Sequence, residues 1–71
     1  MNGNEFIKRV KKLGKATGTS VRFEARQGKG SHGRLYYGSK FTTLKDRKKE
    51  IRAGLLHAML NQLELTIEDI S

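Results

Sequence analysis

The stretch VRFEARQGKGSHGRLYYGSKFTTL, Val21 to Leu44, decides the fold of this chain. Residues 21–26 alternate apolar and charged side chains, which is typical of a half-buried strand. The same period of two recurs in residues 34–37, and a third strand is expected over Lys40–Leu44. Gly38-Ser39 between them suits a two-residue hairpin turn with glycine in the first central position. Three successive strands with short connections predict an antiparallel meander.

Helical patterns lie on both sides of this stretch. Apolar side chains in residues 4–13 fall on one helical face and lysines on the other, which predicts an amphipathic helix. Asn4 or Asn2 is expected to cap its start, and Gly14 to end it in a left-handed conformation. We expect residues 16–20 to form a polar loop.

The C-terminal part contains a second apolar stripe, formed by Ile51, Leu55, Leu56, Met59, Leu60 and Leu63. The stripe predicts a helix over residues 53–63, with residues 46–52 as a loop or a frayed first turn. Thr66 is expected to cap a last short helical turn. The fold class is therefore α+β, in the order helix, three strands, helix, with a three-stranded antiparallel sheet and the helices packed on one face. Residues 1–71 are expected to form a single domain.

The composition excludes several kinds of site. With no cysteine, disulfides and thiolate metal sites are impossible, and two histidines are too few for an ordinary structural zinc site. We therefore predict no metal and no small-molecule cofactor. The N-terminus lacks the apolar run of a signal peptide, and the longest near-apolar stretch, residues 53–60, is too short to span a bilayer. These features predict a soluble, cytoplasmic protein without a membrane partner.

The charge is unevenly distributed along the chain. Residues 1–52 hold all 15 Lys and Arg and four acidic residues, a balance of +11, whereas residues 53–71 hold three acids and no Lys or Arg. A basic body of this kind favours a polyanion as ligand, above all a nucleic acid. The alternative from charge alone is a solvated basic surface that serves solubility.

The glycine-rich segment QGKGSHGR, residues 27–34, places His32 between glycines and next to cations. Its GxGxxG pattern is accidental, because a strand follows it where a dinucleotide-binding motif requires a helix. RNA carries its own nucleophile, the 2′-hydroxyl, so that cleavage needs a positioned proton acceptor or donor and stabilisation of phosphate charge. An imidazole suits proton transfer at neutral pH. The alternative interpretation is a surface histidine in a hairpin loop.

Other titratable residues carry weaker signals. His57 lies opposite the apolar stripe of its helix and should face solvent or a partner, without a catalytic role. Glu24, Asp46 and Glu50 would bind a metal only if the fold gathered them. Their spacing does not predict that.

The element order, the tripeptide Gly30-Ser31-His32 entering the second strand, the following Tyr36 and Tyr37 and the leucine-rich last helix resemble HicA-type toxins. The resemblance covers most of the chain. It implies an endoribonuclease, an mRNA interferase of a bacterial toxin–antitoxin pair, with a double-stranded-RNA-binding-like fold and a HicB-type antitoxin as protein partner. Because the sequence shows no cluster of carboxylates or histidines, we expect this endoribonuclease to be metal-independent. The family's catalytic histidine corresponds to His32. Many members have a proline, often with a second histidine, after the third strand, whereas this chain has no proline.

Several side chains are candidate contacts to RNA. Ser31 could orient the imidazole or bond a phosphate oxygen, and the candidate phosphate-binding cations are Arg22, Arg26, Lys29, Arg34, Lys45, Arg47, Lys48 and Lys49.

Two further classes of function stay open. The cationic run over residues 45–49 also resembles the lysine cluster with which double-stranded-RNA-binding domains contact phosphates, and such a module binds without cutting. His32 within a glycine loop is the feature that such a module does not require. A protein-interaction module with a basic face would bind no RNA.

Overall fold

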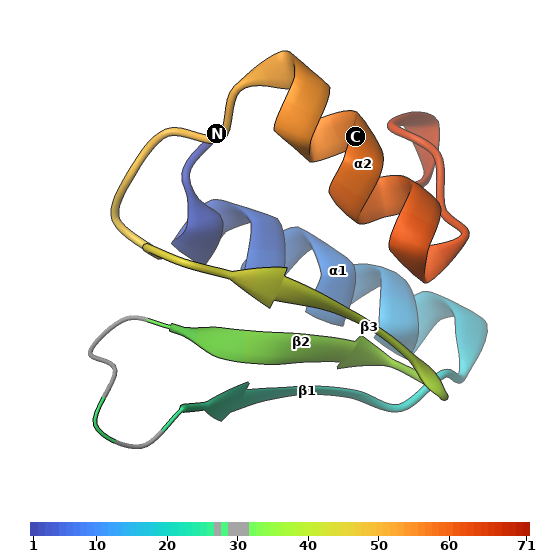
Figure 1. Cartoon of the computed structure of the whole chain (residues 1–71). Helices are drawn as coiled ribbons and strands as arrows, with labels where there is room; N and C mark the ends of the chain where they lie inside the picture. The colour runs from blue at the N-terminus through green and yellow to red at the C-terminus, as the bar shows by residue number, and fades with distance from the viewer. Residues whose placement is uncertain (27, 29–31) are drawn as a thin grey trace.

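The computed structural model describes residues 1–26, 28 and 32–71 (Figure 1). These residues form α1 (Gly3–Thr17), β1 (Val21–Ala25), β2 (Gly33–Tyr37), β3 (Lys40–Leu44), α2 (Ala53–Leu63) and a short 3-10 helix, η1 (Glu68–Ile70). The strands form one antiparallel sheet in the order β1-β2-β3. α1 packs against β1 and β2, α2 packs against β3, and both helices lie on the same side of the sheet (Figure 1). The predicted α+β class and α-β-β-β-α order are confirmed.

α1 is longer than the sequence pattern predicted. It begins at the expected cap, where Asn2 Oδ1 accepts a hydrogen bond of 2.9 Å from the Glu5 amide. The prediction that Gly14 ends the helix is wrong, since the helix continues to Thr17 and Gly18 takes the left-handed cap conformation, with φ of 74°. Gly14 is instead buried inside the helix, where a Cβ would lie 2.4 Å from Val21 Cγ2. Its missing side chain therefore serves close packing of α1 on the start of β1.

The strands and their turn follow the predicted pattern. Tyr37 pairs with Lys40 across the Gly38-Ser39 turn, and Gly38 has a φ of 63°, as the first central position of such a turn requires. The register then places Phe23 opposite Leu35 and Leu35 opposite Thr42. Because side chains alternate along a strand, this register gives the sheet one apolar face and one polar face.

The helix-covered face of the sheet, called the inner face below, contributes to the core. Thr42 is the one buried polar side chain among the described residues, and its hydroxyl donates to Gln62 Oε1 from α2. The buried apolar residues are Phe6, Ile7, Val10, Leu35, Leu44, Ile51, Met59, Leu60, Leu63 and Ile70. The predicted stripe on α2 is confirmed except at Leu55, which is 57% exposed because it lies at the open side of the groove between α2 and β3.

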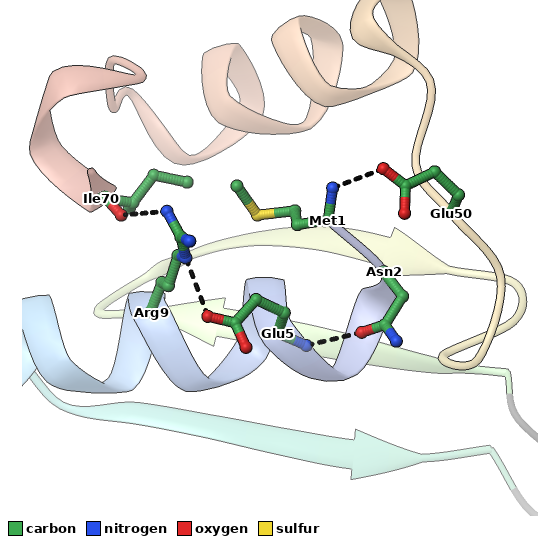
Figure 2. Close-up of polar contacts among 6 residues, drawn as sticks. All are labelled: Met1, Asn2, Glu5, Arg9, Glu50 and Ile70. Carbon is green, nitrogen blue, oxygen red and sulfur yellow. Dashed lines mark hydrogen bonds and ion pairs between the residues drawn. The ribbon is translucent and has the colours of Figure 1, made fainter.

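Polar contacts connect the N-terminal part of the chain with η1 and with the connection before α2 (Figure 2). Arg9 Nε donates to Glu5 Oε2 at 2.9 Å, and Arg9 Nη1 donates to the Ile70 carbonyl at 3.3 Å. The hydrogen bond from Arg9 lowers the pKa of the Glu5 carboxyl below its ordinary value, with further help from the charges of Arg9 and Lys8. Met1 and Glu50 form an ion pair just before the start of α1 (Figure 2).

The segment after α2 follows its predicted capping pattern. Thr66 Oγ1 accepts from the Asp69 amide at 3.3 Å, and Asp69 Oδ2 accepts from the Thr66 amide at 2.8 Å. These reciprocal bonds fix the turn that buries Ile70. Within the described ranges, neither helix has the length and apolar character needed to cross a membrane.

Candidate functional site

His32 lies at the end of the sheet where β1 finishes and β2 begins. Ala25 pairs with Gly33, and Gly33 pairs with Leu44. The Arg26 amide donates to the His32 carbonyl at 2.7 Å, so that backbone pairing continues one residue beyond the two strands. His32 is therefore held by the sheet ladder, and its side chain is exposed.

The outer face of the sheet, opposite the helices, is hollowed at this end. A depression of ≈370 Å³ brings His32 together with Arg26 and Arg34. The described residues that line it are Glu24, Ala25, Arg26, His32, Gly33, Arg34, Tyr36 and Thr43. An exposed histidine thus lines the same shallow, open site as two cations. This composition suits an anionic ligand that can exchange a proton.

Gly33 shapes this site in a way that the sequence did not predict. We expected the glycines around His32 to keep the imidazole accessible and to let the backbone approach a ligand. Gly33 is buried, and a Cβ there would lie 2.3 Å from Phe23 Cζ and 2.7 Å from the Glu24 carbonyl. Its missing side chain therefore accommodates the Phe23 ring on the inner face, while Gly28 supports a turn with φ of 75°.

The arginines predicted to contact phosphate lie in different places. Arg26 and Arg34 line the depression, and Arg34 Cζ also lies 4.7 Å from the centre of the Phe41 ring. Arg22 lies on the same face, beside the depression, with its Cζ 4.2 Å from the Tyr36 ring centre. Arg47 does not join them, since it is half-buried with its guanidinium over the inner-face ring of Phe23, 4.9 Å from the ring centre.

The predicted lysines divide into described and undescribed residues. Lys45, Lys48 and Lys49 are exposed in the connection between β3 and α2, and Lys45 directly follows the residue that pairs with Gly33. They therefore begin at the same end of the sheet as His32. The connection is non-helical, as predicted, with the Lys48 amide donating to Asp46 Oδ1 at 3.0 Å. Lys29, Ser31 and Gly30 lie outside the described residues.

Glu24 is a site residue that sequence reasoning did not assign. It lines the depression and accepts a 2.9 Å hydrogen bond from Arg22 Nε through Oε2. Asp46 and Glu50 are not part of that lining, and the described residues contain no group of three or more His, Asp or Glu side chains that could hold a metal ion. The alternation of β1 places Glu24 on the same face as Arg22. Its position beside His32 depends on the strand register.

His57 is exposed on α2, as predicted, and it is not part of the depression.

No family model matches the chain, and neither the curated proteins nor the solved structures that were compared give a significant match.

Proposed function

We propose that this protein is an endoribonuclease that cleaves RNA by acid–base catalysis at His32. The observation that carries the proposal is the depression on the outer face of the sheet, whose lining includes the exposed His32 together with Arg26 and Arg34. The resemblance of Gly30-Ser31-His32 and of the element order to HicA-type mRNA interferases supports the same function. A cytoplasmic location and a HicB-type antitoxin as inhibitor belong to this proposal.

The proposed reaction uses the nucleophile that RNA supplies. The imidazole of His32 accepts the proton of a 2′-hydroxyl as that oxygen attacks the adjacent phosphorus. The bond from phosphorus to the 5′-oxygen breaks, and this oxygen takes up a proton from solvent. Arg26 and Arg34 stabilise the negative charge that develops on the phosphate oxygens. The products are a 2′,3′-cyclic phosphate and a 5′-hydroxyl.

The test of the catalytic residue compares the two histidines of the chain. His32→Ala should lower single-turnover RNA cleavage by about 10²-fold or more, because general acid–base catalysis contributes 10² to 10⁴ in rate. His57→Ala is the matched control and should cleave normally, since His57 is exposed on α2, outside the depression. Circular dichroism would check that both variants fold. Unchanged cleavage by His32→Ala would exclude the assignment.

The ends of the products test the proposed nucleophile. Attack by the 2′-hydroxyl predicts 2′,3′-cyclic phosphate ends and full activity in excess chelator. The 3′ ends would be identified by mass spectrometry of a cleaved oligoribonucleotide. A free 3′-hydroxyl, or complete inhibition by chelator, would instead indicate water activated by a metal ion.

A non-catalytic RNA-binding module is the second candidate, and the exposed cluster of Lys45, Lys48 and Lys49 favours it. Replacing these lysines with glutamine should weaken binding of every RNA sequence and flatten its salt dependence by up to about 2 in log–log slope. The matched control replaces Lys8, Lys11 and Lys12, which are exposed on α1. It removes the same charge from the helix side of the sheet.

Binding and turnover together distinguish the two candidates. The endoribonuclease proposal expects His32→Ala to keep its RNA affinity while losing turnover, whereas the lysine variants lose affinity. If His32→Ala lost affinity as strongly as the lysine variants but cleaved normally at saturating enzyme, the binding-module function would replace the proposal. No cleavage by the unmodified chain, with tight RNA binding, would lead to the same conclusion.

A further inference from the structure

The outer face of the sheet carries a row of side chains that neither the core nor the proton transfer requires. Arg22, Tyr36 and Phe41 occupy matched positions on β1, β2 and β3. The Tyr36 and Phe41 ring centres are 5.6 Å apart, with 42° between the ring planes. Arg22 lies over the Tyr36 ring and Arg34 over the Phe41 ring, at 4.2 and 4.7 Å from the ring centres. We call these four residues the aromatic row.

The aromatic row faces away from both helices. The register places Tyr36 and Phe41 opposite each other on the face that carries Arg34. The adjacent pair, Leu35 and Thr42, points into the core. Phe41 is 43% exposed, and among the described residues only Leu55 is another large hydrophobic residue that is exposed. An aromatic pair across two strands stabilises a sheet modestly. That contribution does not require an arginine over each ring.

Flat apolar rings with guanidinium groups beside them match the two chemical parts of a nucleotide. A base stacks on an aromatic ring or on a guanidinium plane, and the guanidinium also bonds phosphate oxygens. The chain carries a formal net charge of +8, so that this face complements a polyanion better than it complements a neutral apolar partner. We propose that the aromatic row is a stacking subsite for a nucleobase of single-stranded RNA. The proposal deepens the endoribonuclease function and rests on it only in taking RNA as the ligand.

The strengths of the competing interactions allow a base to enter. A cation–π contact at an exposed site is weaker than the stacking of one base on an aromatic side chain. A base can therefore displace Arg34 from the Phe41 ring, and the released guanidinium can move to the neighbouring phosphate. Arg22 is held in addition by its 2.9 Å hydrogen bond to Glu24. Stacking needs an unpaired base, because bases in a duplex are already stacked on each other. The subsite thus selects single strands over duplex RNA.

The subsite adjoins the depression that holds His32. Tyr36 and Arg34 belong to both, since they line the depression and form part of the aromatic row. A base on the row would therefore belong to a nucleotide next to the phosphate held between Arg26 and Arg34. Stacking would unstack the strand beside the cleaved bond and leave the 2′-hydroxyl free to reach an in-line position.

Binding of an oligoribonucleotide and of an abasic version tests the subsite. The protein is the His32→Ala variant, so that no probe is cut. The three probes are a short single-stranded oligoribonucleotide, a strand of the same length with abasic riboses, and an RNA duplex. The proposal expects about tenfold weaker binding for the abasic and duplex probes. Phe41→Leu should reduce affinity for the base-containing probe about tenfold and leave abasic binding unchanged. Equal affinity for the intact and abasic strands would overturn the proposal.

Tyrosine fluorescence reports the stacking directly, because the chain has two tyrosines and no tryptophan. Tyr37 lies on the inner face with its hydroxyl 2.9 Å from that of Thr17, so that Tyr37→Phe leaves Tyr36 as the single emitter. Saturating single-stranded RNA should quench this variant. Tyr36→Leu, whose single tyrosine is Tyr37, is the matched control. Its fluorescence should fall only by the amount that absorption of the exciting light by RNA explains. Equal quenching of the two variants would overturn the proposal.

The outcomes separate this proposal from the proposed function. Base-dependent binding and Tyr36 quenching without any RNA cleavage would support the subsite and exclude the endoribonuclease. Cleavage of RNA, together with equal affinity for the intact and abasic strands and no quenching of Tyr36, would support the endoribonuclease and exclude the subsite.

Discussion

The inner and outer faces of the sheet are formed by the same three strands, yet they differ in what their side chains do. On the inner face, Leu35 and Leu44 are 0% and 3% exposed and pack under the helices. On the outer face, the neighbouring residues Arg34 and Thr43 are exposed, and no helix of the described residues covers them. Stability is thus concentrated on one face, and the other face is left free to carry charge, rings and the imidazole of His32.

Truncations of single side chains on the two faces should show the largest difference. Leu35→Ala should lower the free energy of unfolding by about 2–5 kcal/mol, because it opens a cavity in the core under the middle strand. Thr43→Ala, on the adjacent strand and the outer face, should cost less than about 1 kcal/mol. Urea titrations followed by circular dichroism would measure both.

A variant that does not fold need not end this comparison. Leu35→Val removes less volume and should cost about 1 kcal/mol, which keeps the loss measurable if Leu35→Ala is unfolded. A cost for Thr43→Ala equal to that of the Leu35 variants would mean that the outer face is part of the core.

The same substitution at two helical glycines should give opposite signs. Gly14→Ala should destabilise the protein by about 1–3 kcal/mol, because its Cβ would lie 2.7 Å from the Thr19 carbonyl as well as against Val21. Gly54→Ala in α2 should stabilise it by up to about 1 kcal/mol, since alanine favours helix and no atom of the described chain lies within 4 Å of the added Cβ. Melting temperatures that rise in both variants would show that Gly14 is not needed for close packing.

The smallest effect concerns Glu5, which lies in the first turn of α1 and belongs to neither face of the sheet. Its lowered pKa means that the folded state favours the ionised carboxylate, so that the resulting stabilisation is present at neutral pH and is lost as the pH falls through the lowered value. Glu5→Gln should therefore melt slightly below the unmodified protein near pH 7 and at the same temperature under strongly acidic conditions. Melting curves over a pH series would measure it. A difference that grows on acidification would contradict this assignment.

Much of the fold could be predicted because alternation along a strand is a local property. A period of two in residues 21–26 and 34–37 assigns the side chains of each strand to alternating faces, and the turn at Gly38-Ser39 fixes the register of β2 against β3. Tyr36 and Tyr37 illustrate this, since adjacent residues on β2 reach opposite faces. The same alternation places Arg22 and Arg34 on the face of the sheet opposite the helices.

The features that could not be predicted depend on approaches between distant segments. Gly14 predicted the end of the helix because glycine is common there. Only the packing of β1 on α1 shows that this glycine allows the two elements to approach closely. Arg47 belongs by sequence to a lysine-rich run, yet Phe23 lies close enough to hold its guanidinium. Glu24 reaches the depression because β1 pairs with β2 in one particular register. None of these contacts leaves a periodic signal in the sequence.

The first turn of α1 rests directly on the backbone of the connection between β3 and α2. The Asn4 amide donates to the Arg47 carbonyl at 2.9 Å, and a Cβ on Gly3 would lie 2.7 Å from Arg47 Cα. This contact joins segments that are separated in the sequence by the whole meander, so that it has a high contact order. The positions of the lysines on either side of Arg47 thus depend on a contact with the start of α1. Arg22 and Arg34, in contrast, are placed by the strand pairing alone.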